Sequence, residues 1–268
     1  MSYASVQSCT LLGIKAQPVT VEIHIGGGLP GMSIVGLPQS AVRESKDRVK
    51  AAILHAELKY PMVKIVVNLA PADLPKQGGR FDLPIALGIL IATGQLPESA
   101  LRNLVVLGEL GLTGQIRSVS GALPAALAFS HSRFGLLIPE ANRQEAMRSA
   151  RTKLYLAEDL LSLYIQLKKG RLAALSPDEP VLQNTDHSQH AKSDMSDVQG
   201  QERARRALEI AAAGAHNLLL VGPPGTGKSM LASRVPSIAP AMTQKESMET
   251  ASIPVSYTHL TLPTTPYV

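Results

Sequence analysis

The chain has 268 residues, of which 45% are hydrophobic and 18% are charged, proportions typical of a water-soluble globular protein of one large or two modest domains. No apolar run reaches the roughly 18 residues that a bilayer span requires, and the N-terminal segment lacks a basic leader followed by an apolar core. These features argue against a membrane partner and predict a cytoplasmic protein. The net charge of +5 permits contact with nucleic acid, but 3% aromatic residues and no tryptophan argue against a base-stacking platform.

Cys9 is the single cysteine of the sequence, so an intramolecular disulfide is impossible, in agreement with a reducing compartment. No activating neighbour is evident in the sequence around it. We therefore interpret Cys9 as a small strand residue and not as a nucleophile.

The first 170 residues read as a mixed α/β domain with its own core. Alternation over residues 5–25 predicts a half-buried strand with His24 on its polar face. Glycines and prolines in 26–38 flank a short strand at 32–35, and Ser40 is placed to cap the helix that follows. The further elements expected are strands at 64–69, 104–107, 134–138 and 153–157, a long loop at 70–84, helices at 84–93, 122–130, 143–149 and 160–168, and a hairpin in 110–121 that turns at Gly114.

Arg43, Lys46 and Lys50 fall at helical spacing on the side of the first helix opposite its apolar face. Two interpretations are open. The row is a patch for nucleic acid or a protein partner, or it is a solvated surface interleaved with Glu44 and Asp47, which is the simpler interpretation. A salt-dependent affinity for branched DNA that is lost when Lys46 and Lys50 are neutralised would favour the first.

Residues 171–196 read as a linker, because they contain little apolar material and many turn formers. His187 and His190, with Asp186 and Asp194 nearby, could suggest a metal site. Side chains on a flexible segment do not hold ligand geometry, so we predict no metal there.

A second domain is expected over residues 197–253. An amphipathic helix at 201–213, with Ala204, Leu208 and Ala211 facing inward, leads into an apolar run at 218–221 that has the composition of a buried parallel strand. The sequence then enters a glycine-rich loop and a second helix. The loop, residues 222–229, consists of Gly222, Pro223, Pro224, Gly225, Thr226, Gly227, Lys228 and Ser229.

This loop has the pattern GxxxxGKS between a strand and a helix, which is typical of phosphate binding. Gly225 and Gly227 allow backbone N–H groups to turn inward around phosphate oxygens. Lys228 can reach the β and γ phosphates, Ser229 can offer its hydroxyl to Mg²⁺, and the helix that follows directs its positive end at the anion. The sequence therefore predicts binding of ATP with Mg²⁺.

Four motifs together resemble the YifB/ComM family of magnesium-chelatase-like AAA+ ATPases: VEIHIGGGLPGMSIVGLP, VNLAPADLPKQGGRFDLPIALGIL, LGELGLTGQIRSVSG and AAAGAHNLLLVGPPGTGKSMLASR. The resemblance covers about residues 3–253. It implies an α/β fold class in which a ribosomal-S5-domain-2-like (Lon-protease-like) α+β domain, 1–170, precedes the start of a P-loop AAA+ α/β domain.

The resemblance also implies functional partners. The segment with Val198, Gly200 and Gln201 is expected to lie against adenine. Full-length members are expected to be ATPases that form homo-hexamers and act on branched or single-stranded DNA in branch migration during competence.

Two other activities follow from related folds. A Lon-like protease needs a serine nucleophile and a lysine base, but the corresponding positions fall near Asp82 and Leu123, and neither side chain can perform the step. A chelatase function is disfavoured because that resemblance is confined to the second domain. A nucleotide-regulated scaffold that docks a protein partner stays open as an alternative.

Hydrolysis requires an acidic residue at a neighbouring strand end, a water-positioning group and usually an arginine finger. No aspartate follows Ser229, and Glu246 and Glu249 lie in a polar helical stretch. The family continues beyond this point, so we expect a fragment that binds nucleotide without hydrolysing it, and so assign no catalytic residue. Residues 254–268 depart from the family pattern, and we expect them to be a non-native tail.

Overall fold

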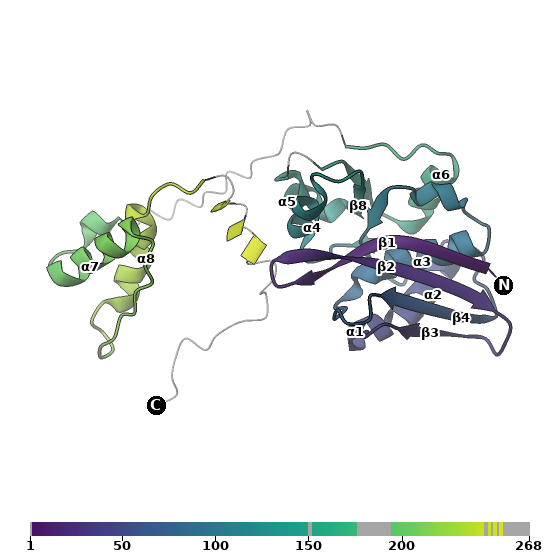
Figure 1. Cartoon of the computed structure of the whole chain (residues 1–268), viewed down its shortest axis with the longest axis horizontal. Helices are drawn as coiled ribbons and strands as arrows, with labels where there is room; N and C mark the ends of the chain where they lie inside the picture. The colour runs from purple at the N-terminus through teal and green to yellow at the C-terminus, as the bar shows by residue number, and fades with distance from the viewer. Residues whose placement is uncertain are drawn as a thin grey trace. The chain divides into compact units, whose positions relative to one another are not determined.

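A computed structural model describes residues 2–149, 152–175, 194–243, 246–247, 249–250 and 252–253. The chain forms two compact units (Figure 1). The first comprises Met1–Val181 with Met248–Val268, and the second comprises Leu182–Ser247.

The described part of the first unit is built on a seven-stranded sheet with the order β3-β4-β2-β1-β5-β8-β9. Only β2 is antiparallel to its neighbours, so the sheet is mixed but mostly parallel. The strands are β1 Ser2–Leu12, β2 Lys15–Gly26, β3 Gly31–Val35, β4 Lys64–Ala70, β5 Leu104–Val106, β8 Gly135–Pro139 and β9 Leu154–Ala157, and a separate hairpin pairs β6 Glu109–Leu110 with β7 Ile116–Arg117. This architecture confirms the predicted α/β class.

The prediction of one strand over residues 5–25 is wrong, because the segment forms the hairpin of β1 and β2. Gly13 lies between the two strands with a φ of 61°, a conformation that glycine adopts without steric cost. His24 lies exposed on β2, as predicted. Cys9 is a buried residue of β1, which confirms its interpretation as a strand residue.

Helices cover both faces of the sheet. Successive side chains of β5 point to opposite faces of the sheet. Val106 packs in the core cluster with α2, α3 and α6, whereas Val105 packs in the cluster with α4 and α5. The helices are α1 Ser40–Arg43, α2 Ser45–His55, α3 Asp82–Ala92, α4 Ala122–Phe129, α5 Arg143–Met147 and α6 Leu160–Lys168, with short 3₁₀ turns η1 Gly79–Phe81, η2 Glu98–Leu101 and η3 Glu140–Asn142.

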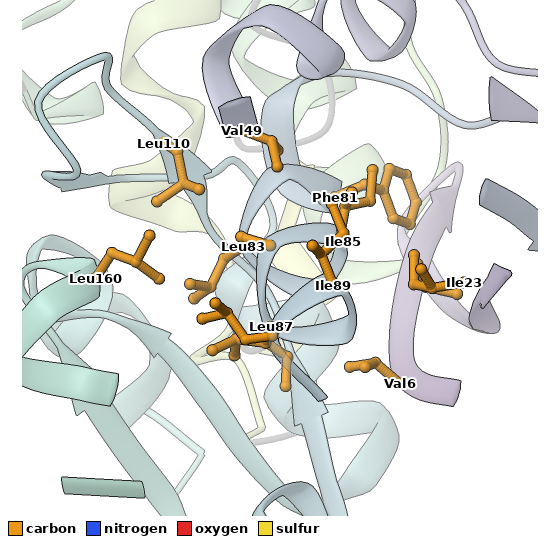
Figure 2. Packing of buried hydrophobic residues seen from close by; sticks show 14 of the residues in the cluster. Val6, Ile23, Val49, Phe81, Leu83, Ile85, Leu87, Ile89, Leu110 and Leu160 are labelled. Carbon is orange, nitrogen blue, oxygen red and sulfur yellow. The ribbon is translucent and has the colours of Figure 1, made fainter. Parts of the chain in front are cut away.

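Helix α3 is at the centre of the larger core (Figure 2). All of its residues except Ile91 are buried, which agrees with the prediction of a buried helix, although it begins two residues earlier than predicted. A Cβ at Gly88 would stand 2.6 Å from Ile23 Cγ1 of β2. This glycine therefore permits the close approach of α3 to the sheet.

The predicted cap at Ser40 is wrong. Ser40 is the first residue of α1, and Gln39 occupies the N-cap position without a side-chain hydrogen bond. The break between α1 and α2 at Glu44 replaces the single helix expected there.

The second unit packs η4 Met195–Asp197, α7 Glu202–Ala213 and α8 Lys228–Ile238 around a small core. The buried residues of this core are Met195, Val198, Leu208 and Leu231. The strand predicted at 218–221 is wrong, because these residues form neither helix nor strand and Leu219 and Val221 are 84% and 85% exposed. A strand needs hydrogen-bonding neighbours, and no described segment pairs with this one.

Most of the predicted linker and the whole predicted tail lie outside the described residues, as do Asp186, His187 and His190. Within the described ranges, no group of three or more histidine, cysteine, aspartate or glutamate side chains could hold a metal ion. None of the described helices combines the length and apolar character needed to cross a membrane.

Candidate nucleotide-binding loop

The glycine-rich loop, residues 222–229, lies directly before α8. Gly225 and Gly227 adopt positive φ values of 82° and 81°, which a side chain would strain. Gly227 is the N-cap of α8, and the helix begins at Lys228. The first-turn N–H groups of α8, which have no intrahelical partner, therefore open toward the loop, where the helix dipole favours negative charge.

Lys228 is held by the loop itself. Its Nζ donates to Pro223 O at 2.6 Å and to Thr226 Oγ1 at 3.3 Å, and Thr226 Oγ1 donates in turn to Pro223 O at 2.9 Å. Ser229, the second residue of α8, is exposed. The side chains of Thr226 and Lys228 thus converge on Pro223 O within the loop.

Gln201 connects the start of α7 to the glycine-rich loop. Its Nε2 donates to Thr226 O at 2.9 Å, and its own backbone has a φ of 54°, unusual for a residue with a side chain. Gly200 precedes it with a φ of 72°. Of the segment expected beside adenine, Gln201 therefore reaches the loop, whereas the side chain of Val198 is buried in the core of the second unit.

Sequence reasoning missed the contacts that fix α8. Met195 N donates to Ser237 Oγ at 3.0 Å, and Arg234 Nε donates to Asp194 O at 3.1 Å. Asp194, which we assigned to the linker, is the N-cap of η4 in a capping box with Asp197. The pattern DxxD before an amphipathic helix was the available signal.

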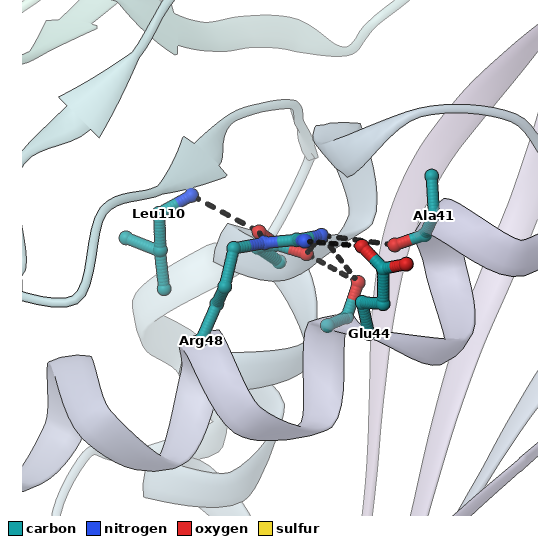
Figure 3. Close-up of polar contacts among 6 residues, drawn as sticks. Ala41, Glu44, Arg48 and Leu110 are labelled. Atoms are coloured by element: carbon teal, nitrogen blue, oxygen red, sulfur yellow. Dashed lines mark hydrogen bonds and ion pairs between the residues drawn. The ribbon is translucent and has the colours of Figure 1, made fainter.

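Near the expected position of a Lon nucleophile lies a carboxylate that is fully buried and hydrogen-bonded at both oxygens (Figure 3). Asp82 is 0% exposed and accepts hydrogen bonds from Ser45 Oγ, from Arg48 Nε at 2.6 Å and Nη2 at 3.1 Å, and from Leu110 N at 3.2 Å. The hydrogen bond that Arg48 donates to Asp82 also raises the pKa of Arg48 above its ordinary value. Ser45 and Arg48 lie three residues apart and so share a face of α2.

The position that corresponds to the Lon lysine holds Leu123, an apolar side chain buried near the start of α4. Its N–H donates to Glu145 Oε1 at 2.9 Å. A serine–lysine dyad is therefore not formed at these two positions, in agreement with the sequence argument.

Comparisons with known proteins identify the family. The family described as "Subunit ChlI of Mg-chelatase" matches residues 21–142, and "Magnesium chelatase, subunit ChlI" matches residues 194–265. The prediction that the magnesium-chelatase resemblance is confined to the second domain is therefore wrong, because the first match lies in the first domain. Competence protein ComM of Haemophilus influenzae is 48% identical over 254 residues, which cover 94% of this chain and 50% of the relative. The chain belongs to the YifB/ComM family. YifB of Escherichia coli is 44% identical over 254 residues, 94% of this chain and 49% of the relative.

This YifB/ComM family member spans about half the length of those relatives. Its likeness to a Lon protease, from Chlamydia trachomatis, is weaker: 24% identity over 135 residues, 47% of this chain and 16% of the protease. The second magnesium-chelatase match runs to residue 265. It therefore lends no support to the prediction that 254–268 is a non-native tail.

Proposed function

We propose that the second unit binds ATP with Mg²⁺ through the glycine-rich loop. The observation that carries the proposal is the state of Lys228, whose ammonium rests on two oxygens of its own loop directly before α8. A neutral carbonyl and a hydroxyl are weaker partners for an ammonium than an anionic phosphate is. A phosphate that enters the loop can therefore replace Pro223 O and Thr226 Oγ1 as the partner of the Lys228 ammonium with little loss of interaction energy.

The residues of the loop fit this ligand. The backbone N–H groups around Gly225 and Gly227 and the first turn of α8 supply donors for phosphate oxygens, and Lys228 supplies the charge. Ser229 would hold Mg²⁺ together with the nucleotide, and the metal would neutralise phosphate charge. Gln201, bonded to Thr226 O, would position the loop against the base, with the backbone of Val198 and Gly200 on the adenine side, since the Val198 side chain is buried in the core.

Titration calorimetry with ATP and Mg²⁺ tests the proposal. We expect Lys228→Ala to abolish measurable heat, and Gly227→Ala to weaken binding because its φ of 81° strains an alanine. Arg206→Ala is the matched control, since Arg206 belongs to the same unit, is exposed and pairs with Glu209 at 3.1 Å. ATP affinity unchanged in Lys228→Ala would overturn the proposal.

We further propose that this chain binds nucleotide without turning it over. In support, Glu246 accepts hydrogen bonds from Thr243 N at 2.8 Å and Thr243 Oγ1 at 2.7 Å. These bonds hold the pKa of Glu246 below its ordinary value, and both are accepted by Oε2 from a residue of its own turn. Rapid release of phosphate from ATP by the purified chain would contradict this assignment.

For the whole protein we propose ATP-driven remodelling of DNA by a homo-hexamer. Support comes from the relative named as a competence protein and from the net charge of +5. A full-length homologue should bind branched DNA with an affinity whose logarithm falls linearly with the logarithm of salt concentration. Binding that is absent or insensitive to salt would overturn the DNA assignment, while leaving nucleotide binding to be judged by calorimetry.

A further inference from the structure

The edge of the first unit's sheet at β3 carries a groove with a volume of about 300 Å³. Strand β3 and the turns beside it form one wall, and α2 forms the other. The lining residues are Pro30, Gly31, Met32, Lys46, Asp47, Lys50, Tyr60, Pro61 and Met62. The groove lies within the first unit and is separate from the glycine-rich loop.

Strand β3 is an open edge. Among the described residues it pairs only with β4, in parallel. Gly31 N donates to Val63 O at 3.4 Å, so its main-chain groups face β4. Because successive residues of a strand direct these groups to opposite sides, the N–H and C=O of Met32 and Ile34 face the open side.

The opposite edge of the same sheet is treated differently. There the chain returns alongside β9, and Leu175 N donates to Leu154 O at 2.7 Å. An open edge is an aggregation hazard that proteins normally cover. The contrast marks the β3 edge as a surface available for another extended chain.

The groove is positively charged. Lys46 and Lys50 are exposed and lie four residues apart on α2, so they project from the same face. Glu44, the nearest opposite charge on that helix after Asp47, lies 3.6 Å from Arg48 and is thereby engaged elsewhere. Two lysines against one aspartate leave a net positive wall along the open strand.

The same edge exposes apolar side chains. Leu29 is 90% exposed, Met62 is 69% exposed and Val35 is 46% exposed. Apolar side chains beside an open strand provide contact area for alternate side chains of an added strand.

We propose that this groove binds an extended, acidic peptide segment of a protein partner, which adds to the sheet at β3 and places carboxylates on Lys46 and Lys50. The main-chain donors and acceptors of β3 match a peptide backbone, whereas a phosphodiester backbone has no donors. The ring of Tyr60 is partly buried and has Lys50 Nζ over one face, 5.9 Å from the ring centroid, so the groove offers a base little open aromatic surface. Peptide therefore fits better than single-stranded nucleic acid.

Fluorescence anisotropy of the full chain tests this proposal. The probe is a labelled ten-residue peptide that alternates valine and glutamate, compared with the same peptide N-methylated at alternate residues and with a valine–lysine peptide. We expect the acidic peptide to bind at least tenfold more tightly than either comparison peptide. N-methylation removes the main-chain donors that edge pairing requires without changing the charge.

Lys50→Glu should weaken binding of the acidic peptide at least tenfold. Lys168→Glu is the matched control, because Lys168 is also exposed and lies over a tyrosine ring, 5.3 Å from the centroid of Tyr164. It should leave affinity unchanged, and both variants should keep the wild-type urea transition.

Three results would overturn the proposal. Equal binding of the N-methylated peptide would exclude strand addition. Tighter binding of a ten-residue oligothymidine, lost in Lys50→Glu, would assign the groove to nucleic acid. Absence of binding by every probe would leave the edge without this role. None of these results bears on ATP binding, which the Lys228→Ala experiment decides.

Discussion

Asp82 in the first unit and Lys228 in the second are both charged groups at the start of a helix, but their surroundings are opposite. Asp82 is 0% exposed and receives hydrogen bonds from three residues on other elements. Among the described residues, the partners of the Lys228 ammonium are oxygens of its own exposed loop. A buried charge must be paired permanently because its desolvation is costly, whereas an exposed cation can exchange partners.

This difference separates a structural site from a binding site within one chain. Asp82, near which the Lon resemblance would place a nucleophile, is part of the scaffold here, since both of its carboxylate oxygens accept hydrogen bonds. In the glycine-rich loop, by contrast, the Lys228 ammonium can exchange its present oxygen partners for a ligand. A likeness of fold to a protease therefore does not imply catalysis at Asp82, whose charge is buried and fully paired.

The largest effect on stability is expected from breaking the buried ion pair of Arg48 and Asp82. Arg48→Met leaves Asp82 buried without its counter-charge and should lower the free energy of unfolding of the first unit by about 3 to 5 kcal/mol. Urea unfolding followed by tyrosine fluorescence measures this unit alone, because residues 182–247 contain no tyrosine.

The double variant Arg48→Met with Asp82→Asn is the control. The neutral amide needs no counter-charge, and its oxygen can still accept from Leu110 N, so a substantial part of the stability should return. If Arg48→Met unfolds at the wild-type urea concentration, the ion pair does not stabilise the first unit. The distinction between Asp82 as a structural site and Lys228 as a binding site would then be wrong.

Much of the first unit could be predicted from the sequence because its elements find their partners within the chain. The strand at β4 and helix α3, which is apolar after Asp82, have unambiguous patterns, and both are observed. The hairpin of β1 and β2 was missed because Gly13 alone marks the turn, and because the change of phase between the strands, from buried Ala4 and Val6 in β1 to buried Val19 and Val21 in β2, was overlooked.

The pattern at 218–221 failed for another reason. An apolar run predicts burial, but a strand also requires neighbours, and local sequence does not tell whether they are present. The site at Asp82 was not predictable, since Ser45, Arg48 and Leu110 meet it from separate elements. The glycine-rich loop was visible because its function depends on consecutive residues.

Cys9 tests whether the interior of the first unit is as closed as the Asp82 site implies. Burial raises the pKa of its thiol from 9.0 to about 11, with Arg80 acting in the opposite direction. The unfolded chain therefore loses this proton first, and the contribution of Cys9 to stability is complete below pH 9 and is lost as pH rises toward 11. At pH 10.5 the loss should be about 2 kcal/mol.

The measurement is the difference in unfolding free energy between wild type and Cys9→Ala at pH 8 and at pH 10.5. The difference should shrink or reverse at the higher pH. In parallel, a thiol reagent at pH 8 should label Cys9 slowly in the native chain and rapidly in urea. Equal labelling rates would show that the first unit opens to solvent and would weaken the contrast between the two units.

The smallest effects are expected at two helix caps, one in each unit. Asp159 accepts from Ser162 N at 2.8 Å at the start of α6, and Asp194 accepts from Ser196 N at 2.7 Å at the start of η4. Asp159→Ala should cost about 1 kcal/mol in the tyrosine transition, whereas Asp159→Asn, which retains the acceptor, should cost less.

At Asp194 the informative variable is pH. The hydrogen bond from Ser196 N, followed by that from its hydroxyl, lowers the pKa of Asp194 below 3.8, so its stabilising contribution is present above that pH and is lost as pH falls through the lowered pKa. The protection factors of the α8 amides, which are corrected for the intrinsic pH dependence of exchange, should therefore fall in acid in the wild type. Asp194→Asn caps without titrating and should remove that acid-dependent component. Should the cap instead prove silent at every pH, α8 would be held by its packing at Leu231 and by the hydrogen bonds of Arg234 and Ser237, without a contribution from the charge of Asp194.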